Sequence, residues 1–417
     1  MNKVKENLIQ YMEGMSIIDA HEHLWPEESV LSGEGLDLMG VLMSHYIALS
    51  LNSSGLNVSR EWLNDCSVPL AQRWAVLSPH LPYIRYTGFF RTAECSLQAL
   101  FGIDRLDDST YEVANERVRQ MLRPGLYDKI LKDHCKIERV LNQYLWDQEH
   151  GYDDFYTEIN TEPLELQYCR TELGFTPEDD NFKILWDKYG NGDENIDEFT
   201  EQWIHRAAGN HHGIKIMGNV PFPCPSFSEA EKQFQFYKKN LDDSPPRDLI
   251  CLYFLHKIIE LAGEYGLVVA VHCGIDWICS TDYYQYAIKN IYEVVMTYKD
   301  TVFDIYHAGV PWVREAGAMG NQCPNANLNL TWIHEISPAM TQSFLDEWID
   351  LVPLNKIIGF GADSSTPFLT AGVRKLTFDN IAEVLSRRVE RGDMGADEAC
   401  DICDLWLCQN PKKIYRL

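Results

Sequence analysis

Ile17-Ile18-Asp19-Ala20-His21-Glu22-His23-Leu24 is the stretch that decides the fold prediction. Its apolar start is typical of a buried strand, and two histidines follow at i and i+2. Successive side chains of a strand alternate between its faces, so this spacing places both imidazoles on one face. Two neutral imidazoles side by side suit a divalent metal ion, which makes His21 and His23 candidate ligands. The motif alone leaves an ordinary pair of strand or loop histidines as the alternative.

Three later apolar runs also end in residues of the kind that bind metals. His272, His307 and Asp363 each come directly after a short strand-like run. In a (β/α)8 barrel the active site is built at the C-terminal ends of the parallel strands. The pattern therefore predicts an α/β protein with a distorted (β/α)8 barrel, in which these side chains converge at one mouth.

The four motifs resemble those of the amidohydrolase superfamily. They are Ile18-Asp19-Ala20-His21-Glu22-His23, Val271-His272-Cys273-Gly274, Tyr306-His307-Ala308-Gly309 and Gly361-Ala362-Asp363-Ser364. The chain is most similar to the amidohydrolase-related (amidohydrolase 2) branch, which also holds uronate isomerases and metal-dependent decarboxylases. The similarity is clearest over residues 15–25 and 265–417.

The resemblance, together with the ligand types, predicts one divalent ion held by His21, His23, His272 and Asp363. The mixed nitrogen and carboxylate set suits zinc, with manganese as the alternative. Such an ion polarises a substrate oxygen. Asp363 is then expected to be the general base. The resemblance implies that His307 hydrogen-bonds the substrate or the developing oxyanion.

The favoured reaction is hydrolysis of an amide, ester or lactone bond in a small polar molecule. Aldose–ketose isomerisation of the uronate type and decarboxylation on the same metal set remain open. Uronate isomerases carry a Thr-Asp-Asp-Pro motif where this chain has Tyr144-Leu145-Trp146-Asp147, which weighs against the isomerase. A binding protein without activity would be expected to have lost ligand positions, and all of them are present.

A long segment between the first two expected strands, residues 24–135, is predicted to be a helical insertion in a single domain of residues 1–417. Its apolar residues lie three and four apart, as in Leu36, Met39 and Met43, and only Tyr83–Tyr86 resembles a strand. An insertion at this point of a barrel emerges on the catalytic face. We therefore expect it to act as a cap that shapes the substrate pocket.

Four further residues are candidate substrate contacts: Arg314, Lys215, Trp312 and Trp277. The guanidinium fork of Arg314 matches a substrate carboxylate, although a salt bridge to a neighbouring acid explains it equally well. Lys215, in the expected strand 213–217, suits either a substrate-facing cation or the carboxylated lysine of binuclear amidohydrolases. Packing is the plain alternative for both tryptophans.

Residues 187–198 partly match a calcium-binding EF-hand loop. The matching positions are Asp187, Asn191, Gly192 and Glu198, with Asp193 as a further ligand. Tyr189 replaces an oxygen ligand at the third position, and no second loop accompanies this one. The alternatives are a calcium site and a solvated turn between helices.

The composition restricts the partners. A formal charge of −26 argues against nucleic acid and anionic membrane surfaces, so a small, polar or carboxylate-bearing substrate is expected. The first residues lack an apolar segment, and the 12 scattered cysteines suggest reduced thiols; both favour a cytoplasmic protein. The sequence leaves the oligomeric state open, a homo-oligomer included.

Overall fold

The structure is a computed structural model and describes residues 3–25, 27–32, 36–43, 46–143, 168–170, 186–187, 190, 192–240, 248–276 and 282–417. These residues contain the strands β1 (Ile17–Glu22), β2 (Ile137–Asn142), β3 (Tyr168–Arg170), β4 (Gly213–Met217), β5 (Val268–His272), β6 (Val302–Ile305), β7 (Ala326–Asn329) and β8 (Ile357–Ile358). The six strands from β3 to β8 form one parallel sheet in which each strand pairs with the next in the chain, and β1 pairs in parallel with β2.

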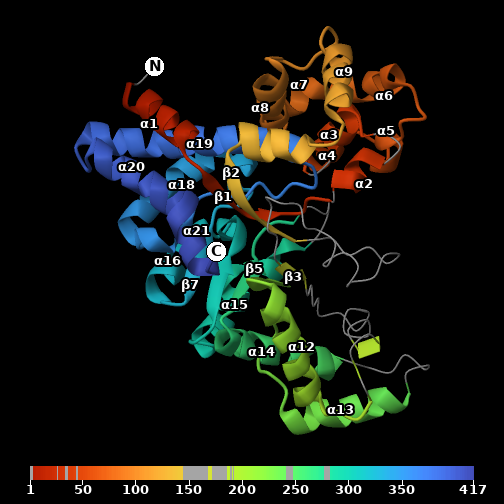
Figure 1. The fold of residues 1–417 in the computed structure, drawn as a ribbon, viewed down its shortest axis with the longest axis vertical. Coiled ribbons are helices and arrows are strands. Elements are labelled where there is room, and N and C mark those ends of the chain that lie inside the picture. Colours follow the sequence, from red (N-terminus) through yellow and green to blue (C-terminus); the bar gives the residue numbers. More distant parts are fainter. Residues whose placement is uncertain are drawn as a thin grey trace.

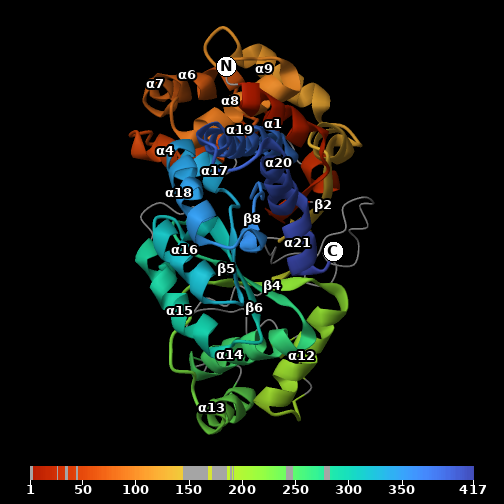
Figure 2. The same cartoon turned by 90° about the vertical axis from the view of Figure 1, so that its left-hand side faces the viewer.

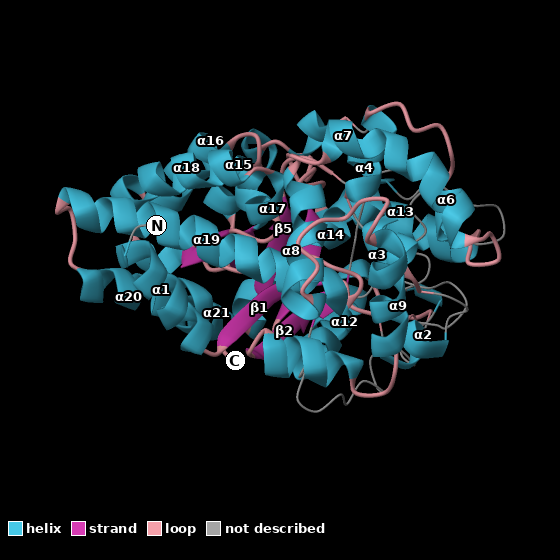
Figure 3. Cartoon of the chain, turned by 90° about the horizontal axis from the view of Figure 1, so that it is seen from above, coloured by secondary structure: helices cyan, strands magenta, loops and turns pink. Residues whose placement is uncertain are grey.

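Backbone hydrogen bonds beyond the end of β8 connect the two sets of strands. Ala20 N donates to Phe360 O at 3.1 Å, and Asp363 N donates to His21 O at 2.9 Å. The segment after β8 therefore runs beside β1, and the strands form the predicted (β/α)8-like barrel. Figure 3 shows the strands enclosed by helices.

Helices surround these strands. The described ones after β3 are α12 (Ile196–Asn210), α13 (Phe227–Lys239), α14 (Asp248–Tyr265), α15 (Ile288–Thr297), α16 (Val313–Gln322), α17 (Ile333–Ile336), α18 (Pro338–Leu351), α19 (Pro367–Arg391), α20 (Ala396–Asp404) and α21 (Asn410–Tyr415). The first helix, α1 (Lys3–Gly14), packs along α19 (Figure 1). Asn195 and Glu198 start α12 with a reciprocal capping box, which satisfies two backbone N–H groups at its first turn.

Between β1 and β2 the described chain is helical. It forms α2 (Glu27–Ser32), α3 (Leu38–Met43), α4 (Ile47–Ser53), α5 (Arg60–Asn64), α6 (Leu70–Leu77), α7 (Leu81–Ile84), α8 (Gly88–Phe101) and α9 (Tyr111–Met121). These helices gather at one end of the molecule (Figure 2). The strand-like reading of Tyr83–Tyr86 is wrong: Pro82 lies in the first turn of α7, and Tyr83 and Tyr86 are exposed.

Two glycines let α8 approach the barrel helices closely. A Cβ atom on Gly88 would lie 1.7 Å from Glu335 O on α17, and one on Gly372 would lie 2.1 Å from Thr92 O on α8. Ser96 Oγ on α8 also accepts a hydrogen bond of 3.0 Å from Gly372 N on α19. Helix α8 thus packs directly against the helices that follow β7 and β8.

A compact apolar cluster lies where side chains of several strands meet, inside the barrel. Its buried members are Ala20, Leu141, Val268, Ala270, Tyr306, Ile358 and Tyr415. Tyr415 comes from α21 near the C-terminus, and its hydroxyl donates to Asp304 Oδ2 at 2.5 Å. The last helix therefore contributes to the barrel interior. None of the described helices is both long and apolar enough for a membrane span.

Candidate functional site

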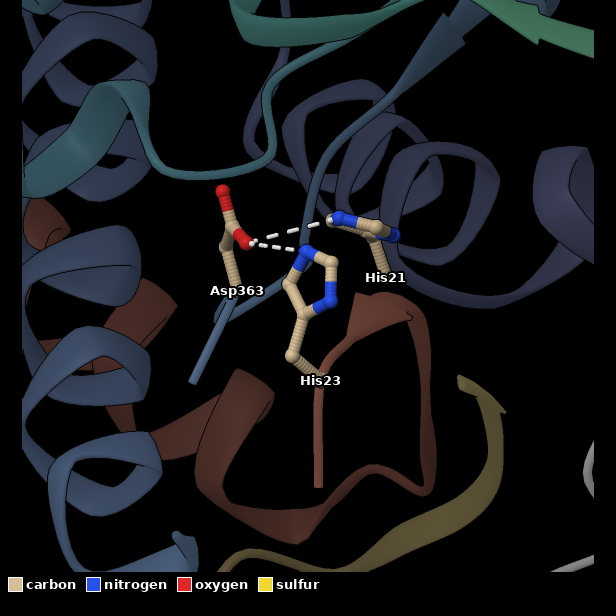
Figure 4. A group of neighbouring side chains, drawn as sticks. All are labelled: His21, His23 and Asp363. Atoms are coloured by element: carbon tan, nitrogen blue, oxygen red, sulfur yellow. Dashed lines mark ion pairs between the residues drawn. The ribbon is translucent and has the colours of Figure 1, made fainter. Parts of the chain in front are cut away.

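One cluster contains His21, His23 and Asp363 (Figure 4). The two histidines lie at the carboxyl end of β1, and Asp363 lies in the segment that follows β8. Asp363 Oδ1 lies 3.4 Å from Nε2 of His21 and 3.4 Å from Nε2 of His23. One ligand atom from each residue falls within 4.8 Å of the others. His21 and Asp363 are buried, and the side chain of His23 is 17% exposed. This cluster could hold a metal ion.

The spacing fits the chemistry of such an ion. Zinc bound at about 2.0–2.1 Å to nitrogen and oxygen ligands in a tetrahedron separates those ligands by roughly 3.4 Å. Both histidine–carboxylate distances match that value. Three protein ligands leave a coordination position for water or substrate, as catalytic sites do.

The carboxylate of Asp363 is strongly acidic in this setting. Burial alone would raise the pKa of Asp363, but the imidazoles of His21, His23 and His307 hold it well below its usual value. The carboxylate is therefore ionised at neutral pH.

Tyr46, from the helical segment between β1 and β2, reaches this cluster. Its hydroxyl donates to Asp363 Oδ2 at 3.2 Å. Burial, followed by the charges of Asp363, Glu335 and Asp276, raises the pKa of Tyr46 well above 10.0. The phenol thus keeps its proton beside a carboxylate. Sequence reasoning missed Tyr46, because nothing local distinguishes it among 21 tyrosines.

Aromatic rings from two parts of the chain pack around Tyr46. Its ring lies 3.8 Å from that of Trp332 and 5.3 Å from that of Phe89, measured between centroids. Trp332 also contacts His307, with centroids 5.0 Å apart. Among the described residues, the buried indole N–H of Trp332 has no hydrogen-bond partner.

The backbone is left-handed at three positions around the cluster. His307, Trp332 and Asp363 have φ angles of 60°, 67° and 55°. L-residues other than glycine adopt this conformation rarely, and it recurs at functional sites where the surroundings enforce it. The barrel therefore holds these side chains in strained positions at the strand ends.

His272 was predicted to bind the metal, but the structure does not place it in the cluster. Its Nδ1 lies 3.0 Å from His307 Nε2, and its Nε2 lies 3.2 Å from Ile275 O. Both ring nitrogens are thus engaged outside the group of His21, His23 and Asp363. His307 lies between His272 and the cluster, and its Nδ1 is 3.9 Å from Asp363 Oδ2.

Lys215 is buried in the middle of β4. Its Nζ lies 3.3 Å from Gln143 Oε1 and 4.3 Å from the centroid of the Tyr306 ring. Strand register pairs Lys215 with Ala270, whereas His272 pairs with Met217. Lys215 therefore lies two residues deeper in the barrel than His272. Its charge contributes to lowering the pKa of both His272 and His307, after the larger effect of burial.

Arg314 and Trp312, two of the predicted substrate contacts, have their partners elsewhere. The side chain of Arg314 is 76% exposed and forms a two-pronged ion pair with Glu347, at 2.8 and 2.9 Å. This is the salt-bridge alternative, with Glu347 as the acid. Trp312 packs against Tyr283 and Tyr284, with centroids 5.9 and 5.6 Å away. Trp277 lies outside the described residues.

The suggested calcium loop is described only in part, and Asn191 lies outside the described residues. Glu198 Oε2 accepts the Asn195 backbone N–H at 2.9 Å as part of the α12 capping box. Lys238 Nζ lies 2.6 Å from Glu194 O and 3.3 Å from Gly192 O. A lysine cation thus already contacts two loop carbonyls, and calcium binding by Asp187, Asp193 and Glu198 stays a prediction.

Comparisons with known proteins connect this architecture to solved structures. No family model and no curated protein sequence matches the chain. Glucuronate isomerase from Caulobacter crescentus is 18% identical, with a TM-score of 0.78 over 99% of this chain and 94% of that one. Uronate isomerase from Thermotoga maritima is 15% identical, with a TM-score of 0.77 over 100% and 98%.

A third structure, from Lactobacillus casei, is of a protein to which metal-dependent hydrolase activity has been attributed. It is 14% identical, with a TM-score of 0.61 over 98% of this chain and 97% of that one. At these identities the likenesses show the fold alone. The chain shares the (β/α)8-like barrel architecture of uronate isomerases along nearly its whole length.

Proposed function

We propose that this protein is a metal-dependent enzyme whose ion is held by His21, His23 and Asp363. The burial of the cluster and its nitrogen and oxygen donors support a divalent ion such as zinc or manganese. A bound ion of this kind supplies Lewis-acid polarisation of a substrate oxygen. His272, which pairs with His307, is left out of the proposed ligand set.

The reaction we favour is aldose–ketose isomerisation of a small sugar acid. The hydrogen bond between Tyr46 and Asp363 beside the metal cluster carries this choice. Isomerisation needs groups that move protons at both carbon and oxygen, and a phenol beside a carboxylate can supply such a pair. Two proteins named as uronate isomerases share the architecture over 94% and 98% of their own length.

Asp363 and Tyr46 would divide the proton transfers between them. In the net reaction one hydrogen moves from carbon 2 to carbon 1, and another moves from the hydroxyl on carbon 2 to the oxygen on carbon 1. Asp363, which is ionised at neutral pH, is assigned the transfer of the proton from carbon 2 to carbon 1. The neutral Tyr46 is suited to exchange a proton with the substrate oxygens.

Three further groups are assigned supporting roles in this proposal. Lys215 provides a positive charge below the site, which favours an anionic substrate over a neutral one. The proposal also assigns substrate contacts to His307 and to the indole N–H of Trp332, whose rings lie 5.0 Å apart. The helices α3, α4 and α8 form the cap over the site, because Tyr46 and Phe89 reach it from that segment.

Hydrolysis of a lactone, ester or amide is the second candidate. The observation that favours it is the shared fold with the Lactobacillus casei protein, to which hydrolase activity has been attributed. In that reaction Asp363 would activate water, and Tyr46 would only orient the carboxylate.

A solvent-exchange experiment separates the two reactions. Protein loaded with zinc or manganese is incubated with glucuronate or galacturonate in D2O, and the sugar is followed by proton NMR. Isomerisation predicts ketose signals that metal-stripped protein does not produce. If neither uronate is converted, the isomerase proposal is wrong. Hydrolysis of lactones or N-acyl compounds by the same sample would establish the second candidate.

A further inference from the structure

Asp363 has a backbone conformation that residues other than glycine rarely adopt. With φ at 55°, it is left-handed, although it is not a glycine. The peptide groups on either side must therefore be held in place by their surroundings.

Two buried carboxyl groups of β1 accept hydrogen bonds from peptide groups in this segment. Asp19 Oδ1 accepts the N–H of Ala362 at 3.2 Å, and Glu22 Oε2 accepts the N–H of Ser364 in a short hydrogen bond. Asp363 lies between these two donors, and its own N–H bonds to His21 O at 2.9 Å. Three consecutive N–H groups are thus fixed by β1.

Each carboxyl group is itself fixed. Asp19 Oδ1 also accepts the N–H of His21 at 3.2 Å, and Glu22 Oε1 accepts the hydroxyl of Thr370 at 2.9 Å. Asp19 and Glu22 are both fully buried. Burying a carboxyl group is costly unless it is hydrogen-bonded, so burial ties both groups to these donors.

The local geometry of β1 lets neighbouring side chains point in different directions. The pairing of β1 with β2 is irregular between Asp19 and Glu22. His21 and His23 face Asp363 from this segment, whereas Glu22, between them in the chain, turns to Ser364 and Thr370. One short stretch therefore supplies two candidate ligands and the group that orients the third.

We infer that Asp19 and Glu22 are positioning residues of the metal site, which clamp residues 362–364 so that the Asp363 carboxylate faces His21 and His23. The inference rests on the metal site proposed above. Hydrogen-bond partners behind metal ligands typically change metal affinity by about 10–100-fold. Here the partners act on the backbone of the ligand rather than on its side chain.

Metal binding by the full chain tests this inference without a substrate. Zinc affinity is measured by competition with a chromophoric chelator, and the visible spectrum of the cobalt-loaded protein reports the ligand geometry. Glu22→Ala should weaken zinc about 10–100-fold and alter the cobalt spectrum. Glu22→Gln should restore most of both, because an amide oxygen can still accept the Ser364 N–H.

Two further variants keep the test decisive. Asp304→Asn changes another buried carboxyl group of the barrel, bonded to Asn329 and Tyr415, and should leave zinc affinity unchanged. Thr370→Val removes only the hydroxyl behind Glu22 and should weaken zinc less than Glu22→Ala does. If Glu22→Ala does not fold, unchanged zinc affinity in Thr370→Val overturns the inference.

The outcomes also separate the clamp from the proposed function. Wild-type protein that binds neither zinc nor cobalt refutes the metal site itself. Wild-type binding together with a folded Glu22→Ala variant of unchanged affinity and spectrum refutes only the clamp.

Discussion

The hydroxyl of Tyr46 lies 3.2 Å from Asp363 Oδ2, although 317 positions separate the two residues in the chain. Tyr46 belongs to the helical segment between β1 and β2, and Asp363 follows β8. The contact brings a proton-retaining phenol to an ionised carboxylate at the proposed metal site. Insertion and barrel therefore both contribute to the chemistry we propose.

Tyr46→Phe keeps the ring against Trp332 and removes only the hydroxyl. Metal content should be unchanged, and turnover should fall by about 10²–10⁴-fold, the usual range for an acid–base group. Steady-state kinetics with the substrate found by NMR measure the effect. Tyr83→Phe, on an exposed tyrosine of the same insertion, is the matched control. Wild-type turnover in Tyr46→Phe would remove the phenol from the mechanism.

Asp363→Asn tests the base. The amide keeps the shape and one oxygen donor but loses the basic site, so part of the metal should remain bound. Turnover should drop by about two to four orders of magnitude, in isomerisation and hydrolysis alike. A variant that retains metal and near-normal turnover would show that the base lies elsewhere, with His307 the next candidate.

Removal of both β1 histidines tests the metal site. Purified wild-type protein should carry about one equivalent of a transition metal, and His21→Ala/His23→Ala should carry none, because Asp363 alone cannot retain the ion. Elemental analysis after dialysis measures the content. His205→Ala, on the exposed side of α12, should bind metal like the wild type. Full metal retention in the double variant would contradict the assignment.

Acid should destabilise the protein through His334. Burial lowers the pKa of His334 to about 4 from 6.5, while its Nε2 lies 3.0 Å from Gly359 O. Below pH 6.5 the unfolded chain takes up a proton that the folded one refuses, so stability present above pH 6.5 is lost on acidification.

The loss from His334 should reach about 2 kcal/mol at pH 5. Urea unfolding at pH 7 and pH 5 measures it, and comparison with His334→Gln isolates this residue from the other titrating groups. Equal pH dependence of the two proteins would show that His334 makes no contribution.

Tyr415→Phe tests the contribution of the last helix to the barrel interior. The change removes a hydroxyl from the buried Asp304 and should cost about 1–3 kcal/mol of unfolding free energy. Chemical denaturation measures it. Tyr86→Phe, at a side chain that is 87% exposed, should have almost no effect. Equal stability of the two variants would mean that Asp304 finds another donor.

Local patterns were enough for much of the fold and part of the site. Strand β4 was predicted with its observed bounds, and β1 and β5 lie where apolar runs lead into His21 and His272, because apolar runs are short-range signals. The His21–His23 spacing and the placement of Asp363 after a strand led to the observed cluster. Parallel strands meet at one edge, so ligands at their ends converge without further information.

The sequence by itself predicted the barrel class and four candidate ligands. Only the tertiary structure decided that three of them, His21, His23 and Asp363, form one cluster, and what surrounds that cluster. The ring of His272 contacts His307 and not the metal cluster. That choice depends on the exact positions of the C-terminal ends of β5 and β6. The pairing of Arg314 with Glu347 and the arrival of Tyr46 at Asp363 both join distant parts of the chain. Such contacts follow from packing of whole elements, which no local spacing encodes.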